Sequence, residues 1–130
     1  FAGFTAPVTN TEGPGAVRRA NDETVDRWLR ILRLSPGGSQ SEPEYSETTI
    51  SDGTPALVAR VLSLPEGGSE PGKCGDKAVE LSFLTFDTGE YSANVVVSRY
   101  VADDGSDLPG GLSADVVQQV LASPRLQVAP

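Results

Sequence analysis

The stretch Ala78–Val101, with the sequence AVELSFLTFDTGEYSANVVVSRYV, decides the fold of this chain. In its first half, apolar and polar residues alternate, as they do in a strand that buries one face. Asp87–Glu90 supplies a turn signal that contains Gly, and Tyr91–Val101 alternates again after it. Two alternating segments joined by a short turn predict a β-hairpin over residues 78–101.

Two further strands are expected before the hairpin. Tyr45–Ser51 is rich in Thr, Tyr and Ile, which favours a short or edge strand. Ala56–Leu64 is mostly apolar, as a central strand is, although so short a run does not exclude a helix. Asp52–Pro55 is the turn signal between them, and Leu126–Val128 is a candidate for a short last strand.

Two amphipathic helices are expected, one before the strands and one after them in the sequence. Residues 17–34 carry apolar side chains at helical spacing, and a Ser-Pro-Gly-Gly sequence ends the segment. Asn21 or Asp22 is the expected cap of its main part. The second helix follows Ser113, a typical N-cap residue, and stops at a Ser-Pro pair.

The order helix, four strands, helix predicts an α+β fold. Short polar turns between consecutive strands favour an antiparallel four-stranded sheet, with the two amphipathic helices packed on one face. The other face is expected to be partly wet, although the apolar Leu84 and Phe86 predict some cover near the hairpin turn. Residues 1–16 are interpreted as a flexible leader or tether and residues 17–130 as a single domain.

Composition excludes several kinds of chemistry. The chain has 130 residues with no His, no Met, one Cys and one Trp. Without His there is no Ser-His-Asp or Cys-His mechanism and no His-ligated zinc, and one Cys cannot form an intrachain disulfide. We therefore expect no cofactor, no metal site and no catalytic residues. A small enzyme built on a carboxylate pair stays open, because the chain has 18 Asp and Glu residues.

Charge indicates which partners suit the chain. The formal net charge is −8, and it divides into +1 over residues 1–33 and −9 over residues 34–130. Such a surface repels nucleic acid and anionic lipid, so a protein is the expected partner. No apolar run approaches the roughly 18 residues that span a bilayer, so no membrane insertion is expected. The sequence does not predict an oligomeric state.

The beginning of the sequence leads to an expectation about location. The chain starts at Phe1 and contains no Met. We therefore expect a preceding segment that has been removed, such as a signal peptide or a membrane anchor.

Candidate binding residues fall in two places. Trp28 lies among Arg27 and Arg30 on the first helix, and Trp and Arg are both enriched at binding hot spots. The alternative is that Trp28 belongs to the core and the arginines to a solvated helix face. The second candidate surface is on the last long strand and comprises Tyr91, Arg99 and Tyr100.

Two loops carry residues that allow more than one interpretation. Cys74 lies between two lysines, which lower a thiol pKa, but no His is present to activate it. It is interpreted as a loop thiol without a catalytic role, or as one half of a disulfide to another chain or to a preceding segment. Asp103–Asp107 is interpreted as a solvated turn, with weak cation binding as the alternative, because the terminal Glu of a calcium loop is missing.

The segment Leu112–Leu126, LSADVVQQVLASPRL, resembles a segment of extracytoplasmic domains of actinobacterial lipoproteins and membrane proteins. Leu29–Pro36, Asp52–Leu64 and Cys74 are similar in outline to the same domains, although a single Cys departs from any pattern with a pair. The resemblance implies a location outside the membrane, on the secreted side. It implies no catalytic residues.

The sequence thus favours a non-enzymatic extracytoplasmic accessory or protein-binding domain, tethered through an N-terminal signal or anchor. The alternative is an acidic inhibitor or immunity-type protein that acts against a basic enzyme, because complementary charge speeds association.

Overall fold

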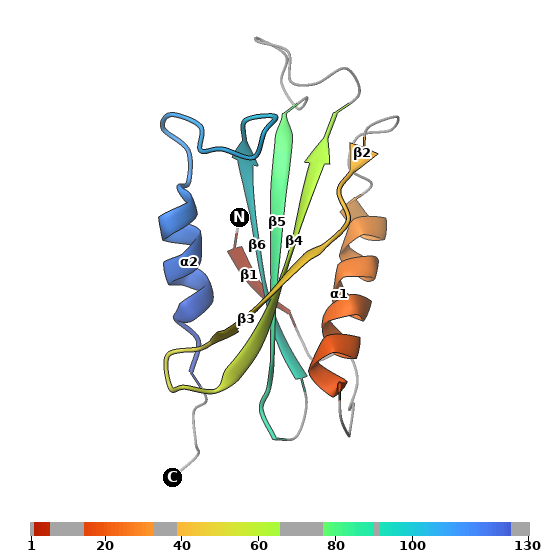
Figure 1. Ribbon diagram of the computed structural model, residues 1–130, viewed down its shortest axis with the longest axis vertical. Helices are drawn as coiled ribbons and strands as arrows, with labels where there is room; N and C mark the ends of the chain where they lie inside the picture. The colour runs from red at the N-terminus through yellow and green to blue at the C-terminus, as the bar shows by residue number, and fades with distance from the viewer. Residues whose placement is uncertain (1, 6–14, 33–38, 66–76, 90–91, 126–130) are drawn as a thin grey trace.

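A six-stranded antiparallel sheet forms the middle layer of the protein, and a helix lies on either side of it (Figure 1). The computed structural model describes residues 2–5, 15–32, 39–65, 77–89 and 92–125. The elements in chain order are β1 (Ala2–Thr5), α1 (Ala16–Leu32), β2 (Ser39–Gln40), β3 (Glu44–Thr49), β4 (Pro55–Leu64), β5 (Ala78–Asp87), β6 (Ser92–Val101) and α2 (Ala114–Ala122).

The predicted hairpin is the centre of the sheet. β5 and β6 pair along their whole length, with Phe83 opposite Val96 and Leu84 opposite Val95. β4 pairs with β5, and β3 pairs with β4, so the four expected strands form a continuous antiparallel meander. The α+β class and the antiparallel sheet are therefore confirmed.

Turn chemistry explains where the strands end. After β5, the Asp87 carboxylate accepts a hydrogen bond of 2.7 Å from the Gly89 N–H, and Gly89 has a φ of 97°. Between β3 and β4, the Asp52 carboxylate accepts one of 3.0 Å from the Thr54 N–H, and Gly53 has a φ of 88°. Glycine adopts such angles without strain, and the Asp that precedes it stabilises the turn by accepting a hydrogen bond from a backbone N–H.

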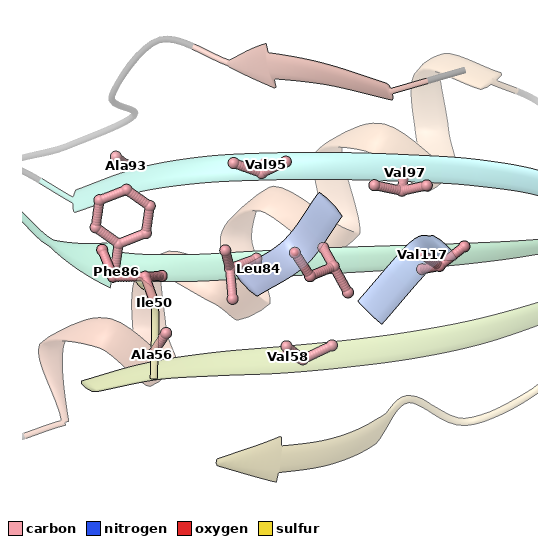
Figure 2. Packing of buried hydrophobic residues seen from close by; sticks show 10 residues of the cluster. Ile50, Ala56, Val58, Leu84, Phe86, Ala93, Val95, Val97 and Val117 are labelled. Carbon is pink, nitrogen blue, oxygen red and sulfur yellow. The ribbon is translucent and has the colours of Figure 1, made fainter. Parts of the chain in front are cut away.

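The helices cover opposite faces of the sheet, which differs from the expectation that both pack on one face. The cluster on the α2 face contains Ile50, Ala56, Val58, Leu84, Phe86, Ala93, Val95, Val97, Val117 and Leu121. The cluster on the α1 face contains Val25, Ala59, Val61, Leu81, Phe83 and Val96, with Trp28, Leu29 and Val79 packed against it. Figure 2 looks onto the first cluster, with α2 over it and α1 behind the sheet.

The reason is the apolar content of both sides of β4, β5 and β6. Successive residues of a strand point to opposite faces, and Phe83 and Leu84 are both fully buried. Each face therefore has to be covered, and one helix packs on each. The partly wet face expected from residues 79–83 is instead covered by a helix.

Short strands extend the sheet beyond the four expected ones. β1 lies within the expected leader and pairs antiparallel with β6 from Ala2 opposite Val97 to Thr5 opposite Asn94. β2 lies in an expected loop and pairs with the end of β4. Several predicted features fall outside the described residues, namely most of the leader, Cys74, Tyr91 and the candidate strand Leu126–Val128.

A buried polar contact fixes α1 on its face. Asn21 does not cap a helix, because α1 begins at Ala16 and continues through it. Its side chain is fully buried, and its Nδ2 donates to the Phe83 carbonyl and to Thr85 Oγ1, both at 3.0 Å. Thr85 Oγ1 in turn donates to Asn94 Oδ1 at 2.6 Å. A shift of α1 would leave these buried polar groups without hydrogen-bond partners, which costs free energy, so the contact sets the position of α1 along the sheet.

α2 is held at both ends. Ser113 is the N-cap, as predicted, and its hydroxyl accepts from the Val116 N–H at 3.2 Å. At the other end, Ser51 in the β3–β4 turn donates to the Pro124 carbonyl from its N–H at 3.0 Å and from its hydroxyl at 2.9 Å. The short helix therefore spans its face between two fixed points.

The packing of α2 makes a prediction about stability. Leu121 is 2% exposed and Val116 is 39% exposed on the same helix. We expect Leu121→Ala to lower the free energy of unfolding by about 3 kcal/mol, because it leaves a cavity in the α2 face. Val116→Ala is the control, with an expected loss below about 0.5 kcal/mol. Urea unfolding measures both, and equal losses would show that α2 does not pack as described.

Candidate functional site

A cavity of about 430 Å³ opens between the start of α1 and the β3–β4 hairpin. This volume is in the range of sites that hold small ligands or side chains of a partner. Its lining combines apolar and charged side chains: Val17, Arg18, Glu47, Thr48, Pro55, Ala56 and Leu57. We call this the α1–β3 groove.

Three side chains connect α1 to β3 beside the groove. Arg18 and Asp22 are one helical turn apart, and their Nε and Oδ1 atoms are 3.1 Å apart. The Tyr45 hydroxyl donates to the same Asp22 oxygen at 2.7 Å. The Arg18 guanidinium lies 3.4 Å from the centre of the Tyr45 ring, a cation–π contact. The three groups hold the edge strand against the helix.

The Tyr45 hydroxyl is kept as a hydrogen-bond donor by its surroundings. Partial burial raises its pKa, and the hydrogen bond to Asp22 and the charge of Asp22 raise it further, whereas Arg18 opposes the shift. A Tyr with a raised pKa stays protonated through the neutral range. The Tyr45 hydroxyl therefore keeps the proton that it donates to Asp22.

Strand β3 is the exposed edge next to the groove. All six of its residues, Glu44–Thr49, are exposed. Its side chains alternate between the two faces, and the register with β4 places Tyr45 and Glu47 on the α1 face. The groove and an exposed edge strand are thus adjacent, on the same side of the protein.

Arg99 is the centre of a second polar cluster, on the α2 face. Its side chain is only 4% exposed. Its Nε donates to Glu80 Oε1 at 3.0 Å, and its Nη1 donates to Asp107 Oδ1 at 2.6 Å and to the Leu112 carbonyl at 3.0 Å. A buried Arg needs such partners because an unpaired buried charge is costly.

Asp107 joins this cluster to α2. Its carboxylate accepts from the Ala114 N–H at 3.2 Å, at the first residue of the helix. The hydrogen bond from Arg99 lowers the pKa of Asp107, and the Ala114 N–H and the Arg99 charge lower it further. The cluster around Arg99 therefore ties β5, β6 and the start of α2 together, and we interpret it as structural.

The first predicted binding surface is divided between core and solvent. Trp28 is half-buried and packs against the α1-face cluster. Arg27 and Arg30 are exposed, and each pairs with an acid one turn earlier on α1, Glu23 and Asp26 respectively. The three predicted residues share a helix and do not line the α1–β3 groove, so their binding role stays a prediction.

The second predicted surface is divided between the faces of the sheet. Arg99 points to the α2 face, and the neighbouring Tyr100 points to the other. Tyr100 is 55% exposed, and the Lys77 ammonium lies 5.5 Å from the centre of its ring. The structure therefore places Arg99 and Tyr100 on opposite faces and does not bring them together, and Tyr91 lies outside the described residues.

The acidic loop before α2 uses its carboxylates within the protein. Asp104 accepts from the Ser106 N–H at 2.9 Å and from its hydroxyl at 2.6 Å, and these bonds lower the pKa of Asp104. In the parts of the chain that the structure describes, no three His, Cys, Asp or Glu side chains are placed to hold a metal ion. Neither α1 nor α2, within the described residues, has the length and apolar content to cross a membrane.

The residues that form the groove were not predicted as a site. Arg18 and Asp22 have the spacing of a helical ion pair, and Tyr45 falls in an expected edge strand. Nothing in the sequence joins them, because the contact between α1 and β3 depends on which face α1 covers. Glu47, the one acid of the expected edge strand Tyr45–Ser51, and the Arg18–Asp22 spacing are the signals of this site in the sequence.

Comparison of the chain with protein-family models, with curated proteins and with solved structures finds no match. The resemblance of Leu112–Leu126 to extracytoplasmic actinobacterial domains therefore stays a prediction. Function is accordingly inferred from the geometry of the groove and of the β3 edge.

The Tyr45 bridge makes a prediction that separates it from a surface tyrosine. Tyr45→Phe removes the hydrogen bond to Asp22 and keeps the ring over Arg18, so we expect a loss of about 0.5–1 kcal/mol in the free energy of unfolding. Tyr100→Phe is the control, with no expected loss. If urea unfolding gives the same value for both variants, the bridge does not stabilise the α1–β3 contact.

The depressed pKa of Asp107 makes a prediction about acid stability. Its stabilisation is fully present above the ordinary Asp pKa and is lost as the pH falls through its lower folded-state pKa. Asp107→Asn should destabilise the protein at pH 7, because it weakens the contacts with Arg99 and the Ala114 N–H, and it should flatten the stability profile below pH about 4. Glu42→Gln, which removes one charge at an exposed position, should do neither. Urea unfolding from pH 7 to acid measures the two profiles.

Proposed function

We propose that this chain is a protein-binding accessory domain that works outside the cytoplasm. The observation that supports binding is the α1–β3 groove next to an edge strand whose six residues are all exposed. Grooves beside exposed strands are a recurrent way to bind an extended segment of another protein. The groove carries the charged Arg18 and Glu47 over an apolar floor, which suits a polypeptide better than a wholly apolar ligand.

The location outside the cytoplasm is supported by the sequence alone. Leu112–Leu126 resembles a segment of extracytoplasmic domains of actinobacterial lipoproteins and membrane proteins. In this proposal, the groove is presented to partners at or beyond the membrane surface.

A second candidate function is an acidic inhibitor of a basic enzyme. It is supported by the net charge of −8 and by the exposed acids Glu42, Glu44 and Glu47 along the β2–β3 edge. Negative surfaces steer positively charged partners and speed their association. Both candidates use the same side of the protein, so one experiment addresses them.

Photo-crosslinking in the source cells tests the binding proposal. A photo-reactive amino acid is placed at Glu47, in the groove, and at the exposed Gln119 on α2 as the matched control. We expect a defined protein adduct from position 47 that is absent from position 119. Adducts at neither position, or the same adducts at both, would contradict a binding site in the groove.

The same cells separate the two candidate functions and test the location. If the captured partner is a basic enzyme whose activity falls on stoichiometric addition of this protein, the inhibitor candidate holds. If the partner's activity is unchanged, the accessory domain holds. Protease added to intact cells or spheroplasts should digest the chain, because it is expected outside the cytoplasm, and complete protection would contradict that location.

A further inference from the structure

The outer edge of β3 has a defined hydrogen-bonding pattern. Ile50 N–H donates to the Thr54 carbonyl at 3.0 Å, and the Ile50 carbonyl accepts from the Gly53 N–H at 2.9 Å, so Ile50 is a hydrogen-bonding position of the hairpin. In antiparallel strands such positions recur at every second residue. Residues between them, which are Tyr45, Glu47 and Thr49, therefore direct their N–H and C=O groups away from β4. In the described parts of the chain, no main-chain partner pairs with this outer edge.

The edge carries negative charge on both faces. Glu47 points to the α1 face and Glu44 to the α2 face. The acids of α1 are neutralised by arginines one turn away, but within the described residues Glu44 and Glu47 make no ion pair. The edge of β3 is therefore a row of open backbone groups flanked by two carboxylates that form no ion pair within the described residues. The nearest cations are Arg60, opposite Glu44 on β4, and Arg18, which lines the groove with Glu47.

An apolar surface lies next to Glu47. Val17, Pro55 and Leu57 line the α1–β3 groove on the same face. A strand added outside β3 would run about 4.8 Å from it, the usual spacing in a sheet. Every second side chain of that strand would point to the α1 face, where one of them reaches the groove.

We propose that β3 accepts an extended, Lys- or Arg-bearing segment of a partner protein as an additional strand. This inference rests on the proposed protein-binding function and names the chemistry of the partner. The segment pairs its backbone with Tyr45, Glu47 and Thr49. Its cationic side chains lie beside Glu44 and Glu47, and an apolar side chain enters the α1–β3 groove.

Charge distinguishes this occupant from a second copy of the chain. Each copy has a net charge of −8, and pairing two β3 edges would bring their glutamates together. Like charges on neighbouring strands are destabilising, whereas opposite charges stabilise the pair. Acidic side chains and irregularities along an edge strand also hinder the pairing of neutral strands with that edge. β2 and β3 supply such an irregularity, because the two residues Glu42 and Pro43 lie opposite Val61 alone.

Titration of the isotope-labelled protein with defined peptides tests the proposal. The probe is the capped heptapeptide VKKVKKV, and the comparison peptides are VEEVEEV and a form of the probe that is N-methylated at alternate residues. We expect the probe to shift the amide resonances of Tyr45, Glu47 and Thr49 first. The acidic peptide should not bind, and the N-methylated peptide should bind far more weakly, because it lacks half of its backbone donors.

Charge reversal provides the matched controls. The double variant Glu44→Lys with Glu47→Lys should weaken the probe about tenfold and bind VEEVEEV instead. Asp103→Lys with Asp115→Lys makes the same change of charge away from β3 and should leave the Kd nearly unchanged. The retained amide spectrum of each variant shows that it is folded.

Three results would overturn strand addition at β3. They are equal binding of the N-methylated probe, shifts confined to another surface, and equal weakening by the control variant. Any of these results would contradict the addition of a basic strand at β3. It would not affect a specific crosslink from position 47, so the proposed protein-binding function would stand. Conversely, the absence of a specific adduct in cells contradicts the proposed function whatever the peptides do. If sedimentation detected self-association at the same protein concentration, the occupant of the β3 edge would be a second copy of the chain and not a basic segment of a partner.

Discussion

Apolar side chains on both faces of β4, β5 and β6 are the constraint on which the rest of the structure depends. Phe83 and Leu84 are neighbours in sequence and are both fully buried, so each face of the sheet has to be covered. Burial of this apolar area is the main favourable term in folding, and two helices are the cover that the described chain provides. Because each face has only one helix, polar contacts fix each in place: Asn21 for α1, and Asp107 with Ser51 for α2.

The candidate site follows from this division of the helices. Since α1 alone covers its face, it lies over β4 and β5 and leaves the edge strand β3 at its side. Tyr45 bridges the interval to α1, and the remaining space is the α1–β3 groove. The groove and the exposed edge are thus products of the same arrangement that buries the core.

Local sequence patterns predicted the main helices and strands well, but they did not predict the contacts between residues far apart in the sequence. The hairpin, the turns with Asp and Gly, and the Ser113 cap depend on residues a few positions apart, so the sequence carries their signal directly. The faces that the helices cover depend on how both sides of the sheet compete for them, and Leu84 and Phe86 were the only hint. Arg99 was predicted as part of a binding surface, but its side chain is buried and pairs with Glu80 on β5 and with Asp107 and Leu112 in the loop before α2.

The pairing of β1 with β6 has a consequence for how the protein folds. β3, β4, β5 and β6 each pair with their neighbours in sequence, whereas β1 pairs with β6, which lies far along the chain. Closing so long a loop costs more conformational entropy, and contacts of this kind slow folding. We therefore expect the meander to form first and β1 to join last. In the native state we expect this strand to open more easily than the meander, so hydrogen exchange should be faster where β6 pairs with β1 than where it pairs with β5.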